Sequence, residues 1–211
     1  RRQRQMCIRD RIGGQLLIAS VPPRKEEMMR SINYYLNVLP ELSVTFRLGQ
    51  EFTGKDYDSF DEVIVATGAT NAIIPVPGKD LPIVTSAWDI LAKKEIVFGN
   101  VSVIGGGLVG VETAEYLAAR GCNVTIIEMM DQIGRDLDPV TKNDMKCQMK
   151  THGVHQLTQT ALLEVKEHSF LVKGSDGSYE LPFDYGFVCL GMRAKGQLYP
   201  CLLYTSDAAD D

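Results

Sequence analysis

The sequence predicts an α/β fold, a Rossmann-like domain in which a parallel sheet carries a β-meander, and three observations predict it. A short apolar segment, 101–104, leads directly into a glycine-rich turn and then into a helical pattern. A second apolar segment, 124–127, follows that helix. Three short alternating segments, separated by turn residues, come later in the chain. The first two observations describe a βαβ unit, and the third describes an antiparallel meander.

The part of the chain before this unit combines one helical and two extended patterns. Apolar residues recur at helical spacing from Arg24 to Leu39, and Glu26 and Glu27 are expected in the first turn, where the helix dipole favours negative charge. Pro40 is expected to end the helix. The other expected elements are a half-buried strand over 43–48, a short buried strand over 61–67 and a proline-rich connector between domains over 75–82.

Two helices of the second part have clear end signals. Gly121 is expected to close the helix that begins at Leu108, and Asp138 with Pro139 is expected to begin the next one, which runs to about His152. The remaining expected elements are a short helix over 86–92, strands over 101–104 and 124–127, meander strands over 161–165, 170–173 and 179–183, and a last buried strand over 187–190.

Both ends of the chain are interpreted as translated sequencing adapter. Residues 1–11 back-translate into a DNA whose reverse complement, read in another frame, encodes residues 201–210. Both peptides therefore correspond to opposite strands of one transposase-type adapter, and we set 1–11 and 201–211 aside from fold reasoning. The natural segment is then expected to be 12–200, internal to a longer protein.

The composition argues against two kinds of partner. Without the two end segments, Lys and Arg fall from 22 to 17 and Asp and Glu from 27 to 23, so the net charge changes from −5 to −6. The one basic cluster disappears with them, which leaves no electrostatic footprint for nucleic acid or for an anionic membrane. No apolar segment approaches the roughly 20 residues that span a bilayer.

Three widely spaced cysteines remain, and their spacing fits neither a disulfide framework nor a metal site. Cys122, Cys147 and Cys189 are therefore expected to be small buried residues in a reducing, cytoplasmic location.

The strongest chemical signal is the sequence VSVIGGGLVGVETAEYLAARGCNVTIIE. Its glycines fill the pattern G-x-G-x-x-G directly after a strand and at the start of a helix. The first glycine permits a tight turn, the second lets the backbone approach a pyrophosphate, and the third lets the helix pack close to the sheet. N–H groups at the helix start attract the phosphates. The pattern predicts that a dinucleotide binds at Gly105, Gly106, Gly107, Leu108, Val109 and Gly110.

An acidic residue at the end of the second strand completes this pattern. Glu128 follows Gly105 by 23 residues and can accept hydrogen bonds from an adenosine ribose. A carboxylate there repels a 2′-phosphate, and no Arg or Lys follows until Arg135. The sequence therefore favours NADH over NADPH.

A second, weaker signal is VIVATGAT at 63–70. A buried strand that ends in Thr67-Gly68-Ala69 exposes backbone amides and a hydroxyl where a strand meets a ligand crevice. The segment equally fits any strand followed by a turn.

Five motifs follow one another along the chain, namely Gly13-Gly14-Gln15-Leu16, VPPRKEE, VIVATGAT, VIGGGLVGVETAEYLAARG and FVCLGMR. They resemble the motifs of flavoprotein reductases with two dinucleotide-binding domains. Within that superfamily, which is pyridine nucleotide-disulfide-oxidoreductase-like, the chain resembles the C-terminal part of NADH:flavin oxidoreductases of the old-yellow-enzyme family. These are relatives of 2-enoate reductase and 2,4-dienoyl-CoA reductase. The resemblance covers all of 12–200.

The resemblance implies an incomplete FAD-binding domain, 12–78, interrupted by an NAD-binding domain, 79–195, with a return to the FAD domain at 196–200. It implies that Glu112 lies near the nicotinamide, whereas the residues alone fit a capping or solvated first-turn acid equally well. The further cofactor-binding residues are expected to be Gly14, Gln15, Thr67, Gly68, Ala69 and Gly191.

The resemblance also implies an activity. Hydride would pass from NADH to FAD, and electrons onward through an iron–sulfur cluster and FMN, in a missing N-terminal barrel, to an activated C=C bond of a small-molecule substrate. The chain alone would be inactive in that reaction, and no catalytic residue or metal ligand is expected within it. Association into a homo-oligomer is left open. The alternatives are an electron-transfer subunit resembling the small subunit of glutamate synthase and a non-enzymatic NAD-sensing module.

We expect the raw sequencing reads across residues 1–11 and 201–211 to contain adapter at both junctions, because the two peptides are encoded by complementary strands of the same DNA. Reads that continue from genomic sequence through both junctions without adapter would contradict this interpretation.

Overall fold

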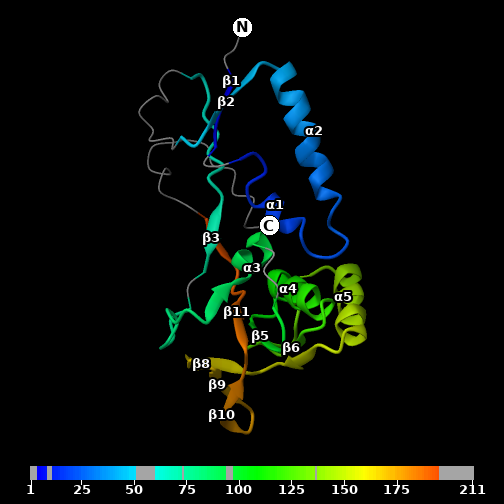
Figure 1. Cartoon of the computed structure of the whole chain (residues 1–211), viewed down its shortest axis with the longest axis vertical. Coiled ribbons are helices and arrows are strands. Elements are labelled where there is room, and N and C mark those ends of the chain that lie inside the picture. Colours follow the sequence, from blue (N-terminus) through cyan, green and yellow to red (C-terminus); the bar gives the residue numbers. More distant parts are fainter. Residues whose placement is uncertain are drawn as a thin grey trace. The chain divides into compact units, whose positions relative to one another are not determined.

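A computed structural model describes residues 4–8, 11–50, 60–72, 74–93, 97–135 and 137–194 (Figure 1). The chain divides into two compact units, one made of residues 1–70 and 193–211 and the other of residues 71–192. We call them unit 1 and unit 2. The expected return segment 196–200, the C-terminal segment 201–211 and Asp136 lie outside the described residues.

Unit 2 is built on a five-stranded parallel sheet, which confirms the predicted α/β fold class. Its strand order is β4-β11-β5-β6-β7. From β5 the chain continues through β6 and β7 on one side, and β11 later pairs with β5 on the other side. The strands are β4 (Val84–Ser86), β5 (Asn100–Ile104), β6 (Asn123–Ile127), β7 (His155–Leu157) and β11 (Tyr185–Val188).

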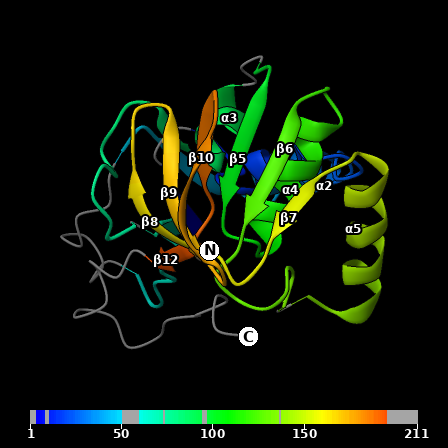
Figure 2. The same ribbon diagram turned by 90° about the horizontal axis from the view of Figure 1, so that it is seen from below.

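Three helices accompany this sheet (Figure 2). Helix α4 packs against β5 and β6 and contacts α3 and α5. Its residues from Gly110 to Ala118 are all buried, which explains why its sequence carries no single apolar stripe. The helices are α3 (Ala87–Lys93), α4 (Leu108–Ala118) and α5 (Pro139–Thr151).

The predicted meander is present as a separate three-stranded antiparallel sheet. Its strands are β8 (Ala161–Val165), β9 (Ser169–Gly174) and β10 (Gly177–Pro182). The phenyl rings of Phe170 and Phe183 pack with centroids 4.2 Å apart. Gly186 on β11 provides the space for this pair, because a Cβ there would lie 2.6 Å from Cζ of Phe170.

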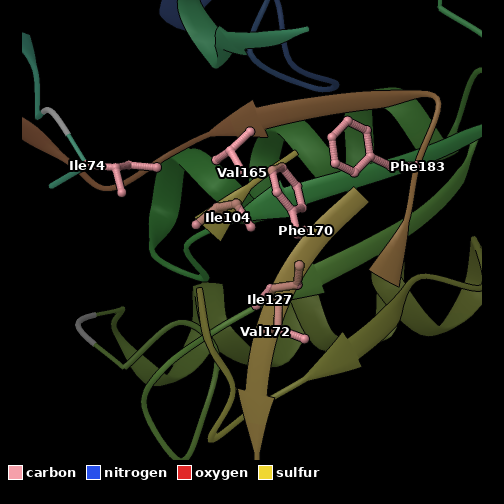
Figure 3. Close-up of a cluster of buried hydrophobic side chains, with 7 residues drawn as sticks. All are labelled: Ile74, Ile104, Ile127, Val165, Phe170, Val172 and Phe183. Carbon is pink, nitrogen blue, oxygen red and sulfur yellow. The ribbon is translucent and has the colours of Figure 1, made fainter. Parts of the chain in front are cut away.

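A cluster of apolar side chains joins the meander to the parallel sheet (Figure 3). Successive side chains of a strand point to opposite faces. Ile104 and Ile127 therefore face the meander, whereas their neighbours Val103 and Ile126 face the opposite side of the sheet. Burial on both faces explains why β5 and β6 are almost continuously apolar. The cluster consists of Ile74, Ile104, Ile127, Val165, Phe170, Val172 and Phe183.

Both predicted helix end signals of unit 2 are confirmed. Gly121 has a positive φ of 88° and donates its N–H to the Ala118 carbonyl, while the Cys122 N–H reaches the Leu117 carbonyl. This is a Schellman motif. At the start of α5, the carboxylate of Asp138 accepts hydrogen bonds from the N–H groups of the next two non-proline residues, both at 3.0 Å. Hydrogen bonds from Thr141 lower the pKa of Asp138.

The described residues of unit 1 form two helices and a parallel strand pair. Strand β1 (Arg4–Ile8) pairs with β2 (Val44–Leu48), the strand expected at 43–48. The helices are α1 (Leu16–Ala19) and α2 (Met28–Glu41). Strand β1 lies within residues 1–11, the segment interpreted as translated adapter. The adapter interpretation concerns the DNA sequence, so the strand does not test it and it stays a prediction.

The predicted bounds of the first long helix are wrong at both ends. Arg24 has a φ of 66°, which a helix does not accommodate, so α2 begins at Met28 and Glu26 and Glu27 precede its first turn. Pro40 lies inside the last turn instead of ending the helix. A proline there removes only one hydrogen bond, and the N–H of Leu42 still donates to the Val38 carbonyl.

The predicted strand at 61–67 is also wrong. Residues 62–68 form no regular element, and Ile64 is 81% exposed. A short apolar segment becomes a strand only where a neighbouring strand completes its hydrogen bonds. The strand begins later in the chain, at β3 (Ala69–Asn71), which pairs with β12 (Met192–Ala194) in a two-stranded sheet.

In the part of the chain that the structure describes, none of the helices combines the length and apolar character needed to cross a membrane.

The cluster between the two sheets leads to a stability prediction. Replacing fully buried Phe170 with alanine should lower the free energy of unfolding by about 3–5 kcal/mol, because the change leaves a cavity. Chemical denaturation measures it. The control is Tyr179→Ala on β10, whose side chain is 41% exposed and should cost much less. Equal losses for the two variants would contradict the placement of Phe170.

Candidate functional site

The glycine-rich turn connects the end of β5 to the start of α4, at the carboxyl edge of the parallel sheet. The strand order reverses beside it, because β6 lies on one side of β5 and β11 on the other. In open α/β sheets, ligands bind at the carboxyl edge where the order reverses. The fold therefore places the predicted motif where such a sheet holds a ligand.

Two glycines of the turn are required by the surrounding backbone. Gly105 has a φ of 102°, and a Cβ there would collide with the carbonyl of Cys189. A Cβ on Gly110 would collide with the carbonyl of Gly105. The turn is also tied to the next strand, because the Gly105 N–H donates to the Ile127 carbonyl at 2.8 Å. The first and third glycines therefore have the structural roles that the motif predicts.

The middle glycine faces open space. Gly107 is exposed and is the N-cap of α4, and no atom of the described residues lies within 4 Å of a Cβ built on it. The first N–H groups of a helix have no partner within the helix. Here they belong to Leu108, Val109 and Gly110, beside a residue without a side chain. This cradle fits a diphosphate, which needs N–H donors and room for close approach.

Glu128 lies directly after β6 and contacts the turn. Its Oε2 accepts a hydrogen bond from the N–H of Gly106 at 2.6 Å, and its Oε1 accepts one from the N–H of Met130 at 2.7 Å. Hydrogen bonds to a charged acceptor are worth about 1.5–3 kcal/mol each. A carboxylate has about four acceptor positions, so these two bonds leave capacity for ribose hydroxyls.

An open cavity of about 360 Å³ lies against the loop that follows Glu128. The loop contributes apolar side chains together with one carboxylate and one guanidinium group. Sequence reasoning noted Arg135 only as a distant cation, but the folded loop brings it into the same cavity as Asp131. The lining residues are Met129, Met130, Asp131, Gln132, Arg135 and Gln159.

Glu112 is buried, with 9% of its surface exposed, and it lies beyond the first turn of α4. The interpretation as a solvated or capping first-turn acid is therefore wrong. Its expected position near a nicotinamide stays a prediction.

The sequence did not indicate that Cys189 contacts the glycine-rich turn and the start of α4. Its carbonyl abuts Gly105, and its Cβ would lie 3.4 Å from a Cβ on Gly110. Burial raises the pKa of the Cys189 thiol to about 12, partly offset by a hydrogen bond with Thr113. Nothing in the local sequence marks this contact, because it depends on β11 lying beside β5. Cys189 and Cys122 are buried as expected, whereas Cys147 is exposed.

The residues expected near FAD form a cluster within unit 1. The side-chain amide of Gln15 donates to the Ala69 carbonyl at 3.0 Å. A Cβ on Gly68, whose φ is 74°, would lie 3.3 Å from the same amide nitrogen. Gly14 is exposed, as are Thr67 and Gly68. The structure thus joins two motifs separated by more than 50 residues, although the strand expected before the second motif is absent.

Gly191 follows β11 in unit 2 and has a φ of 89°. Its carbonyl accepts a hydrogen bond from the N–H of Ala72 at 3.0 Å, next to the β3–β12 pair. Its expected role in cofactor binding stays a prediction.

Comparison with known proteins identifies a family. The sequence profile described as pyridine nucleotide-disulphide oxidoreductase matches residues 19–207, most of the chain.

Among curated relatives, the bilirubin reductase of Mediterraneibacter gnavus is 41% identical over 86% of this chain, and the cinnamate reductase of Clostridium sporogenes is 31% identical over 89%. The match covers 29% of each relative. A 2-naphthoyl-CoA reductase structure superposes with a TM-score of 0.86 at 24% identity, over 95% of this chain and 31% of that one. The chain therefore spans less than a third of these three proteins.

The burial of Cys189 leads to a prediction on thiol reactivity. Because the thiolate is the reactive form and the pKa of Cys189 is raised to about 12, this residue should resist alkylation at pH 8 in the folded protein. Exposed Cys147 should be modified under the same conditions. Iodoacetamide labelling followed by peptide mass spectrometry measures both, with a denatured sample as control. Rapid native labelling of Cys189 would contradict its placement.

Proposed function

The chain belongs to the pyridine nucleotide-disulphide oxidoreductase family, and from that membership we propose that it is the NADH- and flavin-binding part of a reductase. At the coarser level, the family implies flavin-dependent electron transfer from NAD(P)H. The choice of NADH, the residues that bind it and the acceptor of the electrons are the proposal.

The observation that carries the proposal is the open cradle at Gly107. The diphosphate of the nucleotide would lie against the first N–H groups of α4, with the adenosine toward Glu128 and its cavity. The nicotinamide end would then extend toward β11, where Leu190 is 43% exposed. Glu112, on the inner part of α4, is proposed to help position that end.

The preference for NADH rests on charge. Two hydrogen bonds keep the Glu128 carboxylate beside the turn, so it cannot easily move away from a 2′-phosphate. Arg135 lines the same cavity and would attract such a phosphate, but Asp131 there opposes it. The balance of these charges supports NADH.

The flavin half of the proposal rests on the unit 1 cluster. Gly14, Thr67 and Gly68 are exposed, and the side-chain amide of Gln15 donates a hydrogen bond to the carbonyl of Ala69. These residues would hold part of FAD. Gly191, which follows β11 in unit 2, is proposed separately as a cofactor-binding residue. When bound, FAD supplies the hydride acceptor, so this chain needs to bind and orient cofactors without an acid–base residue of its own. A sensor that binds only NAD has no use for this cluster.

We further propose that the electrons reach an activated C=C bond of a small-molecule substrate, in an enzyme of the old-yellow-enzyme type with FMN and an iron–sulfur cluster in an N-terminal part. The support is the likeness to a protein named cinnamate reductase and to one named bilirubin reductase. Both are more than three times as long as the matched segment, which leaves ample chain for such a part. This favours the fused enzyme over a separate electron-transfer subunit.

The cradle gives a direct test. Gly107 has φ −73° and ψ −175°, which alanine also adopts, so Gly107→Ala should leave the free energy of unfolding nearly unchanged. The new Cβ would occupy the space proposed for the diphosphate, and the Kd for NADH should rise at least about tenfold, or about 1.4 kcal/mol. Fluorescence titration with NADH measures it in the full-length protein.

The matched control for this variant is Gly174→Ala on β9. Its new Cβ would make only ordinary contacts, 3.6 Å from a ring carbon of Tyr179 and 3.7 Å from the Thr160 hydroxyl. NADH binding that is unchanged in Gly107→Ala, or reduced equally in both variants, would overturn the proposed site.

A further inference from the structure

We propose that Glu128 is a positioning residue that fixes the shape of the phosphate-binding turn, in addition to any contact with ribose. This inference rests on the proposed function and deepens it. It assigns the carboxylate a role that persists for a nucleotide without ribose hydroxyls.

The first support is the pair of hydrogen bonds at the carboxylate. Glu128 stands between two backbone segments and accepts one N–H from each, Gly106 in the turn and Met130 in the loop that lines the cavity. Each oxygen holds a different segment. The side chain therefore links the turn to that loop.

The second support is an independent tie between the same segments. The N–H of Gly134 donates to the carbonyl of Gly106 at 2.7 Å. Gly106 thus uses both its N–H and its carbonyl to bind the segment that follows β6. Ile133, which is buried, closes the remaining side, because a Cβ on Gly106 would lie 3.0 Å from its Cγ1.

These contacts determine which donors remain for a ligand. The N–H of Gly106 is occupied by Glu128, so the diphosphate would use the N–H groups at the start of α4. Those groups follow directly after the open space at Gly107. We expect their direction to depend on the orientation of the Gly106 peptide, which immediately precedes the helix N-cap. Glu128 would therefore act on the phosphates through the backbone, without contacting them.

Charge repulsion and positioning predict opposite changes in the affinity for the diphosphate when the Glu128 carboxylate is removed. The direction of the measured change therefore distinguishes them. A carboxylate near a diphosphate repels it, so removal of that charge should strengthen phosphate binding. If the carboxylate positions the turn, its removal should weaken the same binding. Glutamine is nearly isosteric, but its side chain has one acceptor oxygen and a donor nitrogen, so it can accept only one of the two N–H groups and breaks the link between the two segments.

The experiment titrates the full-length protein and its Glu128→Gln variant with NADH and with an analogue whose adenosine carries 2′,3′-dideoxyribose. The analogue lacks the hydroxyls that a ribose contact needs. We expect the variant to bind the analogue at least about fivefold more weakly than the wild type does. Analogue binding that is equal or tighter in the variant would overturn the positioning role and leave only the ribose contact.

Two further variants separate the effects of lost charge and of impaired folding on binding from the effect of the lost backbone contacts. Glu128→Asp keeps the charge but is one methylene shorter and cannot reach both N–H groups, so it should also weaken binding of the analogue. Glu167→Gln removes an exposed carboxylate from the turn between β8 and β9 and should change neither Kd. If Glu128→Gln does not fold, Glu128→Asp provides the decisive comparison.

A kinetic measurement gives a second readout. Because Glu128 lies on the adenosine side of β5, flavin reduction at saturating NADH should stay within about twofold of wild type while KM rises. A fall in the saturated rate with unchanged KM would contradict the inference. Failure of the wild-type protein to bind NADH at all would instead overturn the proposed function, so the two failures are distinguishable.

Discussion

The structure depends on the close approach of three backbone segments at the glycine turn. The carbonyl of Cys189 occupies the place of a side chain at Gly105, and the carbonyl of Gly105 occupies the place of one at Gly110. Strand β11, the turn and helix α4 can therefore lie in direct contact. Any side chain at either glycine would separate α4 from the sheet and redirect the N–H groups at its start. The proposed chemistry requires this contact before it requires any particular functional group.

The remainder of unit 2 holds that contact in place. Helix α4 is buried on all sides from Gly110 to Ala118, and the apolar cluster on the opposite face of the sheet anchors the ends of β5 and β6 through Ile104 and Ile127. The segment after β6 then returns to the turn through Glu128 and Gly134. The turn is thus supported from the helix, from the sheet and from the following loop.

Local signals predicted much of this arrangement. Asp138 with Pro139, the Gly121 end signal and the alternating meander segments act within a few residues, so their outcomes followed from the sequence. Features that depend on distant neighbours did not. Among the described residues, the apolar segment near Ile64 has no neighbouring strand to complete the hydrogen bonds that a strand needs. Strands β4 and β7 are only three residues long, and pairing with β11 and β6 stabilises them. The spacing of Glu128 predicted its position at the end of β6, but its bonds to Gly106 and Met130 depend on how the following loop folds.

The order of the sheet separates the two ends of any long ligand that crosses the edge at β5. Adjacent strands are about 4.8 Å apart. The loop after β6 and the segment after β11 therefore flank β5 about 10 Å apart, and they share no residue. In the proposed function, changes in the loop from Met129 to Arg135 would then alter which nucleotide is accepted without disturbing the segment at Leu190 and Gly191. For the proposed function, such a division would let a chain of this fold accept a different nucleotide while the other half of the site stays the same.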